Sequence, residues 1–191
     1  MLELSMHILD IVQNSLAARA SLVEIRVRED LERDLLILEV EDNGRGMAPE
    51  LTRRVTDPFY TSRTTREVGL GLPLLKLAAE RCGGRLEVES QEGKGTKISA
   101  VFGLDHFDRA PLGDMGETLA VLVCGNPGVD FLYEHGVDGQ TYRLATREMR
   151  DILGPVSLDE PSVHDFIRRD VREGLKKIKA ASFPKIMEVL R

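Results

Sequence analysis

The chain has 191 residues, enough for one large domain or for one domain with a smaller appendage. Acidic residues outnumber basic residues by 32 to 26, which gives a formal net charge of −6. This balance disfavours general nucleic-acid binding, because neutralising the phosphates of a nucleic acid needs surplus lysine and arginine.

The sequence also limits where the protein acts. No apolar run approaches the length of a membrane span, and the first residues lack the basic start and apolar block of a signal peptide. The two cysteines, Cys82 and Cys124, match no metal-binding spacing, and isolated cysteines suggest a reducing compartment. We therefore expect a cytoplasmic protein without membrane or nucleic-acid partners.

The first hundred residues predict the order helix, two strands, loop, helix, two strands. Apolar residues at helical spacing predict the opening helix, and alternation or apolar runs predict the strands. The expected helices cover residues 3–20 and 72–82, with a short helix and a long loop over 48–69. The expected strands cover 22–28, 35–40, 85–90 and 96–102.

The second half is expected to be a small α+β extension. A polar stretch, residues 105–116, suggests a boundary, so we divide the chain into 1–104 and 105–191. Strands are expected at 118–124, 131–133 and 140–144, the last two as a hairpin. Thr146 is expected to cap a short helix that stops at Gly154.

The last helix is expected to begin at Ser162 and to be amphipathic. Its predicted apolar face comprises Val163, Phe166, Ile167, Val171, Leu175 and Ile178. The same segment also contains a basic stretch: Arg168, Arg169, Arg172, Lys176, Lys177 and Lys179. Two interpretations remain for this helix: it docks on its own sheet with a solvated basic face, or it forms a surface for a protein partner or a homodimer.

On the opening helix, Asp10 and Asn14 lie four residues apart and therefore share one face. The oxygen of an asparagine side chain is a suitable ligand for Mg²⁺. A carboxylate one turn away can hold a metal-bound water or take a proton from an attacking group. Taken alone, the pair is equally consistent with a solvated helix face.

Three glycine-containing segments follow. In Asp42-x-Gly44-x-Gly46, a carboxylate at a strand end can accept a hydrogen bond from an exocyclic amine, and the glycines allow a close backbone approach. The segment from Phe59 to Leu72 places glycines at a helix start, where the helix dipole favours anions. The pair Gly95-Thr96 lies in a turn that lacks the glycine spacing of a Walker A motif. Each segment alone reads as an ordinary turn or loop.

Together and in this order, the segments resemble the N, G1, F, G2 and G3 boxes of the GHKL superfamily, which includes gyrase B subunits, Hsp90 chaperones, histidine kinases and mismatch-repair MutL proteins. The resemblance covers Leu4 to about Phe102. It implies an α/β (α+β) two-layer sandwich, with a mixed sheet of the Bergerat type, helices on one face and the small C-terminal extension. It also implies that the protein binds ATP with Mg²⁺.

By this resemblance, Asn14 would coordinate Mg²⁺ and Asp42 would accept the adenine amino group. Gly44 and Gly46 would let the backbone pass beside the base, and Thr96 would contact its edge. Residues 59–72 would form a lid over the nucleotide. The lid residues implied at the phosphates are Gly69, Leu70, Gly71 and Leu72, together with Arg63 or Arg66.

Asp10 departs from the superfamily pattern. In its ATPases and anti-sigma serine kinases, a glutamate at this place serves as general base, and Asp10 is one methylene shorter. His7, on the same helix face, is expected to line the rim of the site. The resemblance as a whole implies a regulatory ATPase or protein kinase with a protein partner or substrate. Two alternatives stay open: a nucleotide-gated interaction module without catalysis, and an anti-sigma-type serine kinase.

Overall fold

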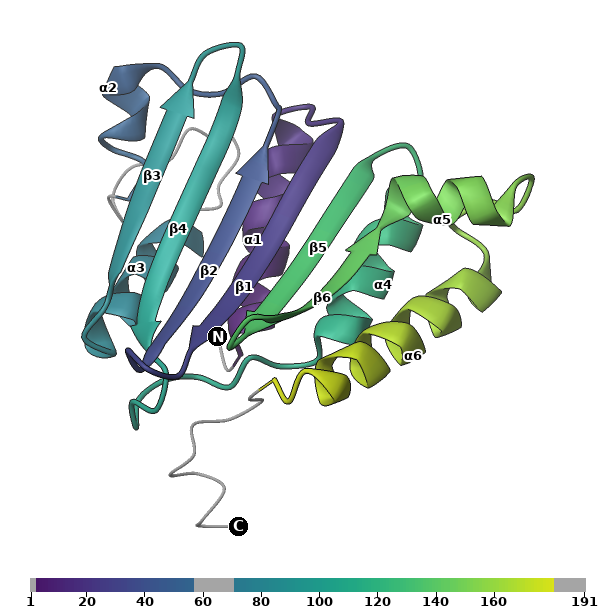
Figure 1. The fold of residues 1–191 in the computed structure, drawn as a ribbon. Coiled ribbons are helices and arrows are strands. Elements are labelled where there is room, and N and C mark those ends of the chain that lie inside the picture. Colours follow the sequence, from purple (N-terminus) through teal and green to yellow (C-terminus); the bar gives the residue numbers. More distant parts are fainter. Residues whose placement is uncertain (1–2, 57–70, 181–191) are drawn as a thin grey trace.

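The computed structural model describes residues 3–56 and 71–180, drawn in colour in Figure 1. The helices are α1 (Leu4–Ala17), α2 (Pro49–Thr52), α3 (Gly71–Arg81), α4 (Met115–Gly125), α5 (Thr146–Leu153) and α6 (Pro161–Lys177). The strands are β1 (Leu22–Asp30), β2 (Leu35–Asp42), β3 (Arg85–Gln91), β4 (Gly95–Gly103), β5 (Asp130–Val137) and β6 (Gln140–Ala145). The predicted element order of the first half is confirmed.

The strands form one mixed sheet with the order β3-β4-β2-β1-β5-β6 (Figure 1). Neighbouring strands are antiparallel except β1 and β5, which run parallel. The predicted hairpin between β5 and β6 is present, and its turn residues Asp138 and Gly139 have φ values of 45° and 80°. Two positive φ values are what the tightest hairpin turns require.

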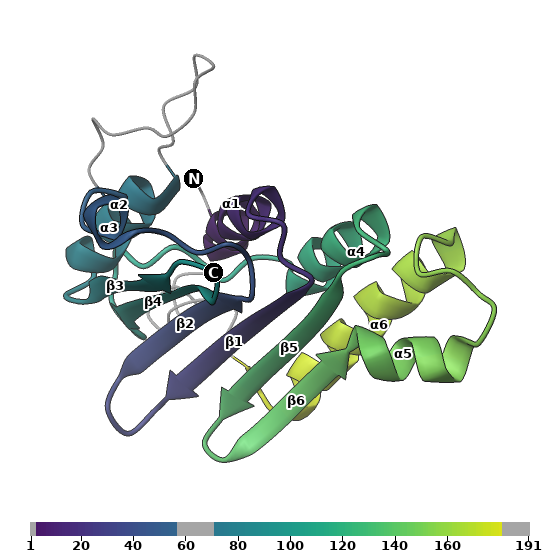
Figure 2. The same ribbon diagram turned by 90° about the horizontal axis from the view of Figure 1, so that it is seen from above.

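Helices α1, α3, α4 and α6 all lie on one face of the sheet (Figure 2). The sequence dictates this layering because β1 alternates: Val23, Ile25 and Val27 are buried, whereas the residues between them are half-buried or exposed. Helix α1 covers this face with apolar residues that recur at helical spacing and are at most 2% exposed: Leu4, Ile8, Ile11 and Val12. The predicted two-layer sandwich with helices on one face is therefore confirmed.

The opposite face of the sheet carries ion pairs. Arg26 of β1 lies 3.0 Å from Glu41 and 3.7 Å from Glu134, so it links three adjacent strands. Lys97 of β4 lies 2.9 Å from Glu39 of β2. Cross-strand pairs of opposite charge suit a solvated sheet face. In the parts of the chain that the structure describes, no helix has the length and apolar character that crossing a bilayer requires.

The strand predicted at 118–124 is wrong, because this segment belongs to helix α4. Met115, Leu119, Leu122 and Val123 are buried at helical spacing, and Asp114 caps the helix by accepting the amide N–H of Glu117 at 3.0 Å. The misleading signal was the unbroken apolar run from Leu119 to Val123. In a helix buried against both a sheet and another helix, such a run loses its periodicity.

Two further details differ from expectation. Thr146 begins α5, yet its hydroxyl accepts the amide N–H of Phe131 at 2.8 Å and does not cap the helix. The last helix starts at Pro161, a favoured first helical position, instead of Ser162. Phe166 is 52% exposed and does not belong to the buried face that contains Val163 and Ile167. Most of the apolar face of α6 nevertheless docks within the chain.

The two halves of the chain share this sheet. Strand β5 pairs with β1 from Leu22 to Glu29, and a buried hydrogen-bonded row crosses the junction. The His135 imidazole lies 2.8 Å from the Glu29 carboxyl group and, through its other nitrogen, 2.8 Å from the Tyr133 hydroxyl. All three side chains are at most 1% exposed. The division at residues 104 and 105 remains a prediction, whereas the shared sheet is a structural fact.

Candidate functional site

The site is built around the carboxylate of Asp42, at the end of β2 on the face that the helices cover. Asp42 is 9% exposed. Its Oδ2 atom accepts the hydroxyl proton of Ser15 at 2.7 Å, and its Oδ1 atom accepts the amide N–H of Gly44 at 2.8 Å. Hydrogen bonds to a charged acceptor are short and strong, so these two donors fix the orientation of the carboxylate. Ser15 is a site residue that the sequence interpretation missed.

Helix α1 also carries Asp10 and Asn14, the second of which directly precedes Ser15. Both side chains are exposed, whereas Ser15 is 2% exposed and points into the protein. A Cβ atom placed on Gly71 would lie 3.3 Å from the Asp10 Cβ and 3.4 Å from its Oδ2. The predicted acidic residue therefore lies directly beside the first residue of α3. The structure thus brings Asp10 of α1 next to Gly71 of α3.

The loop after β2 is held by its own polar groups. The Asn43 side-chain oxygen accepts the amide N–H groups of Ser21 and Leu22, each at 2.9 Å. Gly44 packs tightly, since a Cβ placed there would lie 2.9 Å from the Cβ of Ala18. Gly46 has a φ of 64°, and an added Cβ would lie 1.9 Å from the carbonyl oxygen of Gln91. The need for glycine at position 46 therefore follows from protein packing, whatever else this loop contacts.

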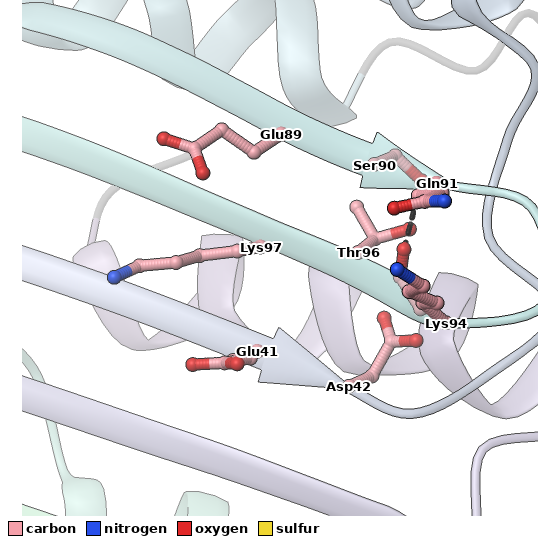
Figure 3. A pocket seen from close by; sticks show the side chains of 9 residues that line it. Glu41, Asp42, Glu89, Ser90, Gln91, Lys94, Thr96 and Lys97 are labelled. Atoms are coloured by element: carbon pink, nitrogen blue, oxygen red, sulfur yellow. Dashed lines mark hydrogen bonds between the residues drawn. The ribbon is translucent and has the colours of Figure 1, made fainter.

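Thr96 lies opposite Asp42 in the pairing of β4 with β2. Its hydroxyl lies 2.9 Å from the hydroxyl of Ser90, which also accepts the amide N–H of Met47 at 2.8 Å. Figure 3 shows Asp42, Thr96 and Ser90 gathered where β2, β4 and β3 meet. Ser90 is a second residue that the motifs did not reveal.

A hollow of about 300 Å³ opens at this end of the sheet (Figure 3). It is lined by Glu41, Asp42, Glu89, Ser90, Gln91, Lys94, Gly95, Thr96 and Lys97. Strand alternation places Glu41 and Lys97 on the open face, opposite the buried side to which Asp42 points. The hollow thus touches Asp42 and Thr96, although Asp10 and Asn14 are absent from its lining.

The remaining predicted residues fall into two groups. Leu72 is 6% exposed and belongs to the hydrophobic core, which leaves its backbone for the predicted ligand contact. Arg63, Arg66, Gly69 and Leu70 lie outside the described residues. The described residues contain no group of three or more His, Cys, Asp and Glu side chains that could hold a metal.

His7 differs from its expected place at the rim. It is 4% exposed, and burial lowers the pKa of its imidazole below 6.5, while the charge of Asp10 acts in the opposite direction. Its Nδ1 atom has no hydrogen-bond partner. The site thus contains one buried polar atom that the described contacts leave unsatisfied.

A family model described as "Histidine kinase-, DNA gyrase B-, and HSP90-like ATPase" matches residues 2–106, which contain all the residues of the site. A solved structure described as the crystal structure of the N-terminal domain of a DNA repair protein aligns with a TM-score of 0.50 at 20% identity. That alignment covers 76% of this chain and 53% of the other, and at this identity it supports the fold alone.

Among curated proteins, a putative sensor protein of Shewanella frigidimarina is 31% identical over 108 residues, which are 56% of this chain and 16% of the relative. A probable C4-dicarboxylate sensor kinase of Bacillus subtilis is 39% identical over 69 residues, which are 36% of this chain and 13% of the relative. Sporulation kinase E of Bacillus subtilis is 39% identical over 66 residues, covering 35% of this chain and 9% of the relative. The alignments therefore span less than a fifth of each of these relatives.

Proposed function

The chain belongs to the histidine kinase-, DNA gyrase B- and HSP90-like ATPases, and from this premise we propose that it binds ATP with Mg²⁺ and acts as a regulatory ATPase or protein kinase. Its protein substrate or partner would be a component of a signalling pathway. Two of the relatives are named as a sensor protein and a sensor kinase, which supports a signalling role for this chain.

One observation carries the nucleotide part of the proposal: the fixed carboxylate of Asp42. Ser15 and the Gly44 amide hold it at 2.7 and 2.8 Å, and Thr96 lies opposite it on β4. A carboxylate so oriented keeps lone pairs free, since each oxygen can accept more than one hydrogen bond. An exocyclic amine such as that of adenine is the matching donor. Asp42 and Thr96 would therefore recognise the base.

The donor set also suits Mg²⁺. Magnesium prefers oxygen ligands, keeps several waters and is commonly bound by one or two side chains together with substrate phosphates. Asn14 would supply such an oxygen from the same exposed helix face as Asp10, which lies beside Gly71. When bound, the ion would offset the charge of the phosphates. Asn14 would be its direct ligand, and the start of α3 would face the phosphates with its free amide groups.

Asp10 would act on the attacking group. Its carboxylate would take the O–H proton of a water or of a protein hydroxyl as the new bond to the γ-phosphorus forms. The bond from that phosphorus to the bridging oxygen breaks, and the oxygen leaves with ADP. Asp10 is one methylene shorter than glutamate, and Gly71 beside it adds no side chain that would keep a phosphate away from the carboxylate.

The experiment follows γ-labelled ATP with the parent protein, with Asp10→Asn and with the matched control Asp151→Asn, an exposed carboxylate on α5. We expect label on water or on protein in the parent and control, and at least a roughly hundredfold loss in Asp10→Asn, the lower range for a general base. Phosphoserine on an added acceptor protein would favour the serine-kinase version. Binding without any turnover would favour the nucleotide-gated module, and no binding at all would refute the proposal.

A further inference from the structure

The imidazole of His7 is a buried polar group with an unsatisfied hydrogen-bonding atom. The side chain is 4% exposed, and its Nδ1 atom lacks a hydrogen-bond partner. Buried polar atoms in native proteins are almost always paired, so an unpaired one calls for an explanation such as a role in catalysis or ligand binding. No helix-capping or packing requirement of α1 explains it, because an apolar residue would fill the same buried position.

Helix geometry shows which partner is within reach. His7 precedes Asp10 by three residues and Asn14 by seven, spacings that place all three on one face of α1. Against the larger effect of burial, the negative charge of Asp10 acts to raise the pKa of the His7 imidazole, as expected for neighbours on one helix face. Asp10 itself is exposed and makes no hydrogen bond or ion pair with the described residues. A donor and an acceptor, each lacking a partner, therefore lie one turn apart.

We propose that His7 is a positioning residue, whose Nδ1–H donates a hydrogen bond to the Asp10 carboxylate when nucleotide occupies the site. This inference rests on the proposed function, in which Asp10 takes the proton of the attacking group. Before binding, the exposed Asp10 side chain samples several rotamers. The buried imidazole is fixed by packing, so a bond from it selects one carboxylate orientation, beside Gly71. His7 acts through Asp10 and does not touch the reacting atoms.

The buried environment suits this role. Burial lowers the pKa of His7, which keeps its ring neutral near pH 7 with one N–H to donate. A neutral imidazole can orient the Asp10 carboxylate by donating a hydrogen bond. A cation at the same place would also stabilise the ionised carboxylate strongly, whereas the neutral ring does not. Asp10 consequently keeps the proton affinity that a base requires.

Three substitutions separate positioning from packing. Asparagine at position 7 carries an amide nitrogen near the place of Nδ1, glutamine carries one near the place of Nε2, and leucine carries none. We expect His7→Gln and His7→Leu to lose roughly ten- to a hundredfold in kcat, as when partners that orient reactive ligands are removed. His7→Asn should recover most of this loss. The ATP affinity measured by calorimetry should stay within about threefold in all three, a change of less than 1 kcal/mol.

A double-mutant cycle tests whether His7 acts through Asp10. In the Asp10→Asn background, His7→Leu should cause no further loss of kcat. An additional tenfold loss there, or equal kcat for His7→Leu and the parent, would overturn the inference while leaving the proposed ATPase or kinase activity in place. A parent without turnover would instead refute the proposed function and, with it, this role for His7.

Nitrogen-15 NMR on the unmutated protein gives a readout independent of turnover and of variant stability. The chain has four histidines, so His7 can be assigned with a single His7→Asn sample. With Mg²⁺ and a non-hydrolysable ATP analogue, we expect the His7 ring to be neutral and protonated at Nδ1, with a shift that changes in Asp10→Asn. A ring that stays protonated only at Nε2 with the analogue bound would contradict the proposed hydrogen bond.

Discussion

Replacing Ser15 by alanine removes one of the two donors that hold the Asp42 carboxylate. The lost bond is buried, measures 2.7 Å and has a charged acceptor. Such bonds contribute about 1.5–3 kcal/mol, so we expect Ser15→Ala to lower the free energy of unfolding by about 2 kcal/mol. For a chain of this size, that loss corresponds to a fall in Tm of roughly 4–8 °C.

The assay is urea unfolding at pH 7 with a matched control on the same helix. Ser5 is also buried, at 4% exposed, but its hydroxyl lies 3.4 Å from Glu3 and so contributes little. Both substitutions remove a buried hydroxyl from α1, and their difference reports the bonds of Ser15, of which the 2.7 Å bond to Asp42 is shorter than the 3.3 Å contact with the Ile11 carbonyl. Ser15→Ala should also weaken nucleotide binding, because the carboxylate loses its fixed orientation. Equal stability of the two variants would refute the role assigned to Ser15.

The remaining predictions concern packing, a buried network and pH. In urea unfolding, Gly46→Ala should destabilise the protein by about 2 kcal/mol more than the control Gly93→Ala. Both glycines have positive φ, but only at position 46 would an added Cβ meet a carbonyl oxygen, at 1.9 Å. His135→Leu removes a buried bond to a carboxyl group and should cost about 2 kcal/mol in urea unfolding. His164→Ala, at a half-exposed site, should cost little in the same assay. Because burial lowers the folded-state pKa of His7, the unfolded chain binds more protons, and stability should fall as the pH drops below 6.5. Chemical unfolding from pH 7.5 to 5 should show this fall reduced in His7→Asn, and an unchanged slope would contradict the burial of a neutral imidazole.

The first half of the fold was predictable because its strands keep their period. In β1 the alternation of Val23, Ile25 and Val27 with charged residues indicates a strand with one buried face. The second half was harder. Most of helix α4 is buried, so its apolar run resembled a strand. Asp114 followed by Glu117 was a capping signal that could have identified the helix. The parallel pairing of β5 with β1 joins residues about a hundred positions apart, and no local pattern encodes it.

The site was predictable where a backbone motif defines it and not where packing does. Asp42 and Gly46 could be predicted from sequence only because they stand in a fixed order with Asn14, Gly71 and Thr96, since a strand end followed by glycines alone reads as an ordinary turn. Ser15 was missed because its role depends on how α1 packs against the end of β2, 27 residues away. For His7, the helical spacing gave the correct face, but only the packed structure reveals its burial and its unpaired Nδ1.

The most direct test of the account is calorimetric titration with Mg²⁺ and a non-hydrolysable ATP analogue, comparing the parent with Asp42→Asn and Glu41→Gln. These two carboxylates are adjacent in sequence but lie on opposite faces of β2. We predict binding by the parent, an affinity at least about tenfold lower for Asp42→Asn, as expected for losing a charged acceptor, and no change for Glu41→Gln. Equal affinity of Asp42→Asn and the parent, or no binding by the parent, would contradict the claim that ATP binds on the helix-covered face beside Asp42.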